Sequence, residues 1–170
     1  MISPTKAGSV VSAGRVATVV APRFTGFSIC TATEIAAPAD VVWKELTNAT
    51  AYPEWNPFIR HLSGNLAAGQ RLTITVQPAG KAPFVFTPEV LVADENRELR
   101  WAGKLGVKGI FDGEHYFVLN ETETGTTILR HGEDFSGMLA RPLMALMGEN
   151  ICRGFEAMNL ALKTRVESVA

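Results

Sequence analysis

The stretch FDGEHYFVLNETETGTTILRHGEDF, residues 111–135, is typical of two β-strands joined by a polar turn. Apolar and aromatic residues alternate with polar ones on both sides of the segment Glu121–Gly125. Side chains along a strand point to opposite faces in turn, so His115, His131 and Glu133 fall on the same face as the bulky apolar residues. The sequence therefore predicts an antiparallel hairpin that carries ionisable groups on its apolar face.

The register of this hairpin follows from its turn. We place the turn at Glu121–Gly125, because Gly125 readily adopts the positive φ angle of a tight turn. A hairpin centred on Glu123 pairs Phe111 with Phe135, Gly113 with Glu133, His115 with His131, Phe117 with Leu129, and Leu119 with Thr127. Opposed Cβ atoms lie about 5 Å apart, so the two imidazoles and the carboxylate share one patch.

Three interpretations of the patch remain open. In the structural one, the groups hydrogen-bond to each other or to a neighbouring helix inside the core. In the second, they hold the polar end of a largely apolar ligand. In the third, His115, His131 and Glu133 are catalytic, and a histidine oriented by Glu133 acts as general base or acid on a carbonyl-bearing substrate. These residue types also bind metals, but strand spacing alone is a weak signal, and we expect no metal site.

After Gly137 the period of the apolar residues changes from two to that of a helix. The apolar positions are Leu139, Leu143, Leu146, Met147, Ile151, Phe155, Met158, Leu162 and Val166. They step by three and four and so predict one long amphipathic helix, with Pro142 in its first turn. Core packing is the usual meaning of such a stripe, and ligand lining is the alternative.

The chain before the hairpin is read as strands and two short helices. A strand at 27–36 precedes a helix that ends near Thr47, and one further turn surrounds Glu54 and Trp55 between two prolines. Further strands are expected at 58–63, 70–78, 83–94 and 97–103. The fold class is therefore α+β: a curved antiparallel sheet of about seven strands, two short helices after the first strand, and a long C-terminal helix.

We divide the chain into an N-terminal tail, residues 1–26, and one domain, residues 27–168. The tail is rich in Ser, Thr, Ala and Val, and it contains one possible extra strand at Arg15–Ala21. A cytoplasmic protein is expected, with organelle targeting by residues 1–26 as the weaker alternative.

Composition excludes several classes of function. The 170 residues carry a net charge of −1, and the basic residues are scattered singly, so no nucleic-acid partner is expected. There is no apolar run of about 18 residues, which argues against stable membrane insertion. Cys30 and Cys152 match no metal-ligand spacing and are expected to be reduced. No nucleophile elbow or phosphate loop occurs.

Three segments carry a resemblance to a known family: APADVVWKELTNATAYPEWNPFI at 37–59, ELRWAGKLGVKGIFDGEHYFVL at 98–119, and GTTILRHGEDFSGML at 125–139. In order and motif the chain resembles the SRPBCC superfamily, also called START-like or Bet v 1-like, and within it the polyketide cyclase/dehydrase-like branch. The resemblance implies the helix-grip fold, in which a curved sheet wraps around the long helix and leaves an apolar cavity. Members include lipid carriers, hormone receptors and cyclases, so it does not select one function.

From these observations we expect a hydrophobic small molecule, such as a lipid, polyketide or terpenoid, to bind between the sheet and the helix. The expected ligand-binding residues are Trp101, Phe111, His115, Phe117, Leu129, His131, Glu133, Phe135, Leu143, Met147, Ile151 and Phe155. The alternative is a cofactor-independent cyclase, dehydratase or isomerase that uses the His/Glu patch. No cofactor is expected, and the protein is expected to be a monomer or a homodimer.

Overall fold

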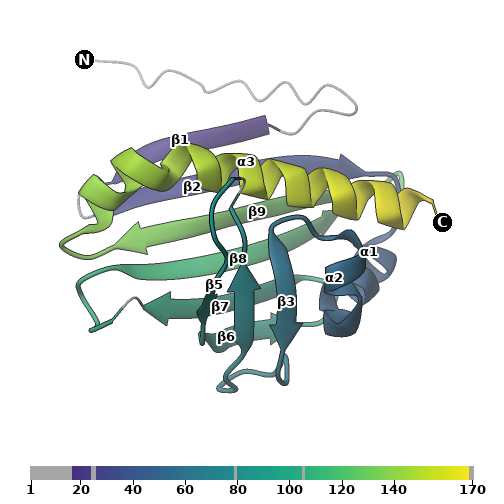
Figure 1. The fold of residues 1–170 in the computed structure, drawn as a ribbon. Helices are drawn as coiled ribbons and strands as arrows, with labels where there is room; N and C mark the ends of the chain where they lie inside the picture. The colour runs from purple at the N-terminus through teal and green to yellow at the C-terminus, as the bar shows by residue number, and fades with distance from the viewer. Residues whose placement is uncertain (1–16, 24–25, 79, 105, 169–170) are drawn as a thin grey trace, which may run out of the picture.

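A computed structural model describes residues 17–23, 26–78, 80–104 and 106–168 of the chain (Figure 1). Its elements form two antiparallel sheets and one long helix, α3, which spans Ala140–Glu167. The predicted fold class is confirmed, with nine strands among the described residues instead of about seven.

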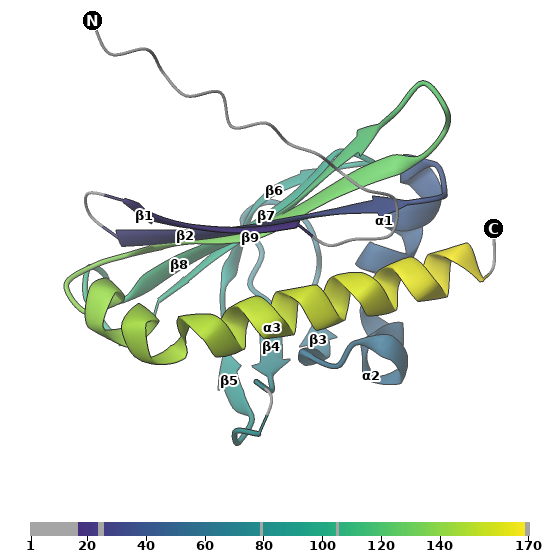
Figure 2. The same ribbon diagram turned by 90° about the horizontal axis from the view of Figure 1, so that it is seen from above.

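The larger sheet has the strand order β1-β2-β9-β8-β7-β6, and every neighbouring pair is antiparallel. The strands are β1 Ala17–Arg23, β2 Gly26–Ile35, β6 Glu89–Asp94, β7 Glu98–Lys104, β8 Asp112–Glu121 and β9 Thr127–Ser136. α3 runs along one face of this sheet, and its closest neighbours there are β2 and β9 (Figure 2).

The smaller sheet consists of β3 Ile59–Ser63, β4 Thr73–Val76 and β5 Phe84–Phe86. It lies on the same side of the larger sheet as α3 (Figure 2). The prediction of a single strand at 83–94 is therefore wrong: the chain breaks into β5 and β6 around Pro88 and changes sheet there. Proline has no N–H for the ladder, so it favours this interruption.

Short helices close one end of the sheet. They are α1 Ala39–Thr47, the 3₁₀ turn η1 Ala49–Ala51, and α2 Tyr52–Trp55. The side chain of Asn56 ends this segment, because its Oδ1 accepts hydrogen bonds from the backbone N–H groups of Phe58 and Ile59. That buried amide directs the chain from α2 into β3.

The β8–β9 hairpin has the predicted faces but a different register. His115 lies opposite Glu133, and Phe117 lies opposite His131. The expected pairing of His115 with His131 is thus wrong by two residues. The turn is closed by hydrogen bonds from the backbone N–H of Thr122 to the carbonyl of Thr126 and from Gly125 N–H to the carbonyl of Thr122, which centres it one residue later than predicted. A shift of two residues keeps every side chain on its face, so His115, His131 and Glu133 remain together on one face of the hairpin.

β1 lies at the edge of the larger sheet and pairs with β2 along its length. The expected extra strand at Arg15–Ala21 overlaps it. The rest of the expected N-terminal tail, residues 1–16, and the targeting interpretation attached to it lie outside the described residues.

A candidate ligand-binding pocket

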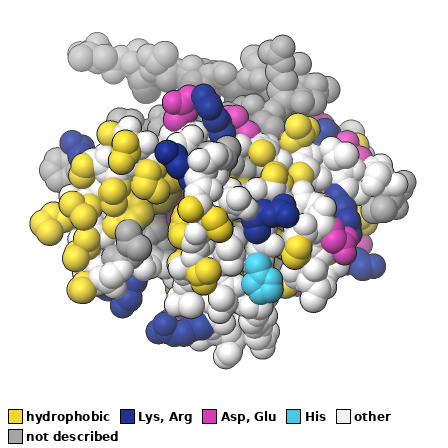
Figure 3. Space-filling model, in the orientation of Figure 1, with side chains coloured by type: hydrophobic (Ala, Val, Ile, Leu, Met, Phe, Trp, Pro, Cys, Tyr) yellow, Lys and Arg dark blue, Asp and Glu magenta, His cyan; other side chains and the backbone are white. Residues whose placement is uncertain are grey.

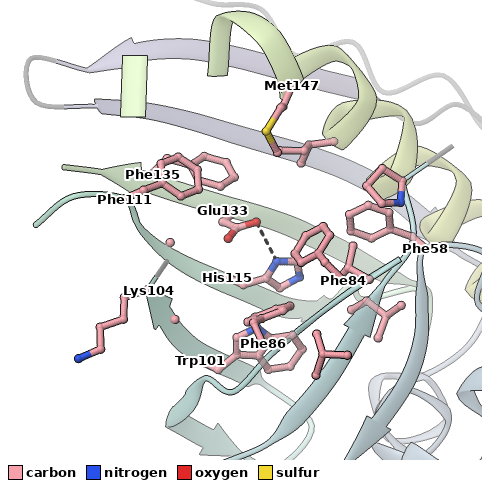
Figure 4. A pocket seen from close by; sticks show the side chains of 17 residues that line it. Phe58, Phe84, Phe86, Trp101, Lys104, Phe111, His115, Glu133, Phe135 and Met147 are labelled. Carbon is pink, nitrogen blue, oxygen red and sulfur yellow. Dashed lines mark hydrogen bonds and ion pairs between the residues drawn. The ribbon is translucent and has the colours of Figure 1, made fainter. Parts of the chain in front are cut away.

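A pocket of about 350 Å³ lies between the large sheet, the small sheet and α3 (Figure 4). Small-molecule sites in proteins typically measure roughly 300–1,000 Å³. The wall of the pocket in this protein contains His115 and six aromatic side chains: Phe58, Phe84, Phe86, Trp101, Phe111 and Phe135. Met147 and Ile151 of α3 line the opposite side. The pocket is therefore mostly apolar, which suits a hydrophobic ligand.

Two glycines explain why this space is empty. Gly103 of β7 and Gly113 of β8 are paired in register and both line the pocket. A Cβ atom added at Gly113 would overlap the Glu133 carboxyl group, and one at Gly103 would lie 3.3 Å from the ring of Phe86. The absence of two side chains from neighbouring strands leaves a depression in the concave face. Glu133 and Phe86 reach over it.

The polar part of the wall is a row across three strands. Trp101, His115 and Glu133 lie directly opposite one another in β7, β8 and β9. The Trp101 and His115 rings are stacked, with centroids 4.9 Å apart and planes 2° apart. His115 Nδ1 lies 3.4 Å from Glu133 Oε2, the contact drawn as a dashed line in Figure 4. One carboxyl group and one imidazole thus face the cavity together.

A buried hydrogen-bonded chain extends this row away from the pocket. His115 Nε2 lies 2.9 Å from His131 Nε2, and His131 Nδ1 lies 2.7 Å from Asn159 Oδ1 of α3. Asn159 Nδ2 donates to Thr31 Oγ1 at 2.7 Å, and Thr31 Oγ1 donates to the main-chain carbonyl of His131 at 2.8 Å. His131 is completely buried, between the rings of Phe117 and Phe155.

Burial shifts the ionisation of all three groups toward their neutral forms. Desolvation, with a smaller contribution from the charge of Asp134, raises the pKa of Glu133 to about 8. Desolvation lowers the pKa of His115 to about 3. It also lowers the pKa of His131, helped by His115 and opposed by the hydrogen bond to Asn159. At neutral pH the pocket therefore contains a protonated carboxyl group beside a neutral imidazole.

The structure brings together seven of the twelve expected ligand-binding residues at the pocket: Trp101, Phe111, His115, Glu133, Phe135, Met147 and Ile151. The other five, Phe117, Leu129, His131, Leu143 and Phe155, do not line it. Phe117, Leu129, His131 and Phe155 are completely buried in the core, and Leu143 is partly exposed on the first turn of α3. These five residues lie away from the pocket because the long helix packs directly on the middle of the hairpin, and the cavity lies toward β7 and the small sheet.

Sequence reasoning missed two parts of the site. The first is β5, whose Phe84, Val85 and Phe86 wall the pocket; the triplet FVF was read as part of a longer strand. The second is Asn159, a buried amide on the apolar face of α3. A polar residue at a core position of the helical stripe was the available signal for it.

The surface beside the pocket is apolar. Yellow side chains gather at the left of Figure 3, over the N-terminal half of α3. Met138, just before α3, and Leu146, in its N-terminal half, are 79% and 78% exposed, while Met147 turns into the pocket. The cation at the rim, Lys104, points away from the cavity in Figure 4.

The described part of the chain holds no group of three or more His, Cys, Asp or Glu side chains arranged for a metal ion. In the patch the two histidines already direct nitrogens at each other, which leaves no common point for ligation. Among the helices that the structure describes, none has both the length and the apolar composition needed to cross a membrane.

Comparisons with known proteins agree with this fold. A family model described as "Polyketide cyclase / dehydrase and lipid transport" matches residues 27–167. A START superfamily protein from Mycobacterium smegmatis superposes with a TM-score of 0.64 at 25% identity, over 84% of this chain and 99% of that one. No curated protein sequence matches.

Two enzymes share the fold at lower identity. The Zhui aromatase/cyclase from a Streptomyces strain has a TM-score of 0.63 at 19% identity, over 82% of this chain and 93% of that one. A norcoclaurine synthase mutant from Thalictrum, solved with a transition-state analogue, has a TM-score of 0.64 at 17% identity, over 91% and 99%. At these identities the likeness extends to the fold alone.

Proposed function

The chain belongs to the polyketide cyclase/dehydrase and lipid transport family, and on that premise we propose that it binds a hydrophobic small molecule of the lipid, polyketide or terpenoid kind. The ligand lies between the sheets and α3, with its apolar body among the aromatic side chains and a polar group at Glu133. The observation that carries the proposal is the aromatic pocket with one pair of hydrogen-bonding groups on its wall.

The character of the wall supports this class of ligand. Removing apolar surface from water stabilises a complex by roughly 25 cal/mol per Å², so an aromatic-lined cavity favours apolar molecules. A single polar row among apolar walls orients a ligand without requiring it to be charged. A highly charged ligand would be disfavoured, because its charge would be desolvated without an opposite charge beside it.

Binding is tested with the neutral fluorophore N-phenyl-1-naphthylamine, whose emission rises in apolar surroundings. We expect saturable binding by the purified protein. Met147→Trp, which places a large ring at the pocket wall, should weaken the affinity at least tenfold, whereas Leu146→Trp should not change it. Leu146 is the adjacent residue on α3 but is 78% exposed and does not line the pocket. Equal affinities in the two variants would contradict the proposed location.

A second candidate function is acid–base catalysis, and the contact between Glu133 Oε2 and His115 Nδ1 favours it. A neutral carboxyl group and a neutral imidazole in contact can take a proton from one position of a substrate and return it at another. Isomerisation, dehydration and aldol-type cyclisation all need this exchange. His131 would act in this reaction through His115, because it does not line the pocket.

Glu133→Gln separates the two functions. Glutamine can keep the hydrogen bonds of a neutral glutamic acid, but it does not exchange a proton. A carrier should therefore retain its affinity in this variant, and an enzyme should lose turnover by a factor of about 10²–10⁴. The measurement is the affinity for, and the conversion of, any molecule that co-purifies with the protein and is identified by native mass spectrometry.

A further inference from the structure

The direction of each hydrogen bond in the buried chain follows from one main-chain carbonyl. The carbonyl oxygen of His131 can only accept, so the single hydroxyl proton of Thr31 is committed to it. Thr31 Oγ1 must then accept a hydrogen bond from Asn159, which fixes the NH₂ group of that amide toward Thr31. The rotated amide would place two oxygen atoms 2.7 Å apart without a proton between them.

The fixed amide in turn determines the tautomers of both histidines. Asn159 Oδ1 accepts, so His131 Nδ1 carries a proton. Because buried His131 is neutral, its Nε2 is bare and must accept from a protonated Nε2 of His115. His115 Nδ1 is then bare and accepts from the protonated Oε2 of Glu133. In the alternative tautomer of His131, a bare Nδ1 would face the lone pairs of Asn159 Oδ1, and two N–H groups would face each other between the rings. In the alternative tautomer of His115, two bare Nε2 atoms would face each other.

This assignment leaves one carboxyl oxygen for a ligand. Glu133 Oε1 lies over Gly113, in the position that a side chain at residue 113 would occupy. Since the carboxyl proton is on the Oε2 side, Oε1 is a hydrogen-bond acceptor. It also remains an acceptor if the shared proton moves to His115 and Glu133 ionises, so this property does not depend on where that proton lies.

We propose that Asn159 is a positioning residue that fixes both histidine tautomers, and that the ligand of the pocket is an apolar molecule bearing an alcohol or phenol hydroxyl that donates to Glu133 Oε1. The proposal rests on the proposed binding function and names its ligand class. A second observation agrees with an oxygen-bearing ligand. The indole Nε1 of Trp101, which also lines the pocket, is buried and has no hydrogen-bond partner among the described residues.

Matched probes test the ligand class. 2-Naphthol and 2-methoxynaphthalene share an aromatic body and an oxygen atom, but only the naphthol donates a hydrogen bond. By titration calorimetry at pH 6.5 we expect the naphthol to bind about tenfold more tightly, since the methyl ether leaves a buried acceptor unpaired. Glu133→Leu, which has no acceptor at this position, should abolish the preference, and a preference retained in this variant would overturn the role of Glu133 Oε1.

The outcomes distinguish the inference of a hydroxyl-bearing ligand from the proposed binding function on which it rests. If 2-naphthol, 2-methoxynaphthalene and naphthalene bind with equal affinity, the pocket binds apolar molecules, and the hydroxyl inference is overturned. If none of the three binds, the proposed function itself is overturned.

Long-range ¹H–¹⁵N correlation spectra of the histidine rings test the role of Asn159. We expect His131 protonated at Nδ1 and His115 at Nε2. Asn159→Asp should move the His115 proton to Nδ1, because a carboxylate favours a doubly protonated His131 that donates onward. Leu160→Ala, at the neighbouring exposed position of α3, should leave the spectra unchanged. A His131 protonated at Nε2 alone in the unmodified protein would overturn the assignment, and that spectrum decides the question even if the aspartate variant does not fold.

Discussion

Gly103 and Gly113 face each other across β7 and β8, and the pocket lies over this pair. Glycine is disfavoured inside strands, because it has no side chain to pack and loses more conformational freedom on folding. Here the two missing side chains create room on an otherwise filled face, and the carboxyl group of Glu133 occupies part of it. The cavity is thus encoded in the strand residues themselves, and α3 and the small sheet enclose it.

Gly113→Ala should therefore break the contact between Glu133 and His115 in the pocket wall. The new methyl group overlaps the Glu133 carboxyl group, which must move away from His115. We expect a loss of stability of about 1–3 kcal/mol, as for overpacking elsewhere, and a weaker preference for 2-naphthol over its methyl ether. Gly103→Ala is the matched control, because its Cβ meets the Phe86 ring at 3.3 Å and leaves Glu133 untouched. Equal naphthol preferences in both variants would contradict this role of Gly113.

Two glycines of α3 should respond in opposite directions to alanine. A Cβ at Gly154 would overlap the ring of Phe58, which packs edge-on against Phe155 and lines the pocket. We expect Gly154→Ala to destabilise the protein by about 1–3 kcal/mol. Gly148→Ala meets only the flexible tip of Met144 at 3.3 Å and should be neutral or stabilising by up to about 1 kcal/mol through helix propensity. Urea denaturation of both variants measures the difference, and the absence of a loss in Gly154→Ala would show that the Phe58 ring moves aside without cost.

Asn159→Ala should destabilise the folded protein strongly although it removes few atoms. It leaves His131 Nδ1–H and Thr31 Oγ1 without their partner in a fully buried setting. Each unsatisfied group costs about 1–3 kcal/mol, so for two groups we expect a loss of about 2–6 kcal/mol in the free energy of unfolding. Leu160→Ala, with Leu160 55% exposed, should change it by no more than about 0.5 kcal/mol. A loss in Asn159→Ala as small as that in Leu160→Ala would mean that the buried hydrogen-bonded chain adds little to stability.

Most of the fold was predictable because it depends on local periodicity. The helical stripe begins at Leu139 in the sequence and α3 at Ala140 in the structure, and the two halves of the β8–β9 hairpin were found with their faces correct. The register was not predictable to better than two residues, because parity alone fixes the faces. The exact pairing depends on how the polar turn at Thr122–Thr126 closes.

The site was predictable only in part. The sequence identified His115 and Glu133 as neighbours on the concave face, and both line the pocket. It could not show that His131 lies behind them, since this depends on where α3 crosses the sheet. Nor could it show that β5 leaves the larger sheet to cover the cavity. Both are tertiary arrangements that no local pattern encodes.

The two buried histidines and the largely buried Glu133 should give folding stability a maximum near pH 6.5. Glu133 has its pKa raised from 4.5 to about 8, so the folded state holds an extra proton in that range and stability falls as pH rises through it. His115 has its pKa lowered from 6.5 to about 3, and His131 shifts in the same direction. Between these lowered pKa values and the ordinary value of 6.5, the unfolded state holds the extra protons, so stability rises with pH. As pH rises toward 6.5, the gain in stability from the two histidines exceeds the loss from Glu133. Above pH 6.5 only the loss from Glu133 continues.

Glu133→Gln isolates the alkaline side of this profile. One pKa unit corresponds to about 1.4 kcal/mol, so the decline between pH 6.5 and 8 should reach at most about 2 kcal/mol in the unmodified protein. The amide variant should remove the decline, whereas Glu123→Gln in the exposed hairpin turn should retain it. Among the described residues, the other charged groups near Glu133 are Asp134, on the opposite face of β9, and Lys104, which points outward; the lining residues of α3 and β5 are uncharged. Urea denaturation at pH 6.5, 7.2 and 8.0 measures the slope, and an undiminished decline in the amide variant would assign it to a group other than Glu133.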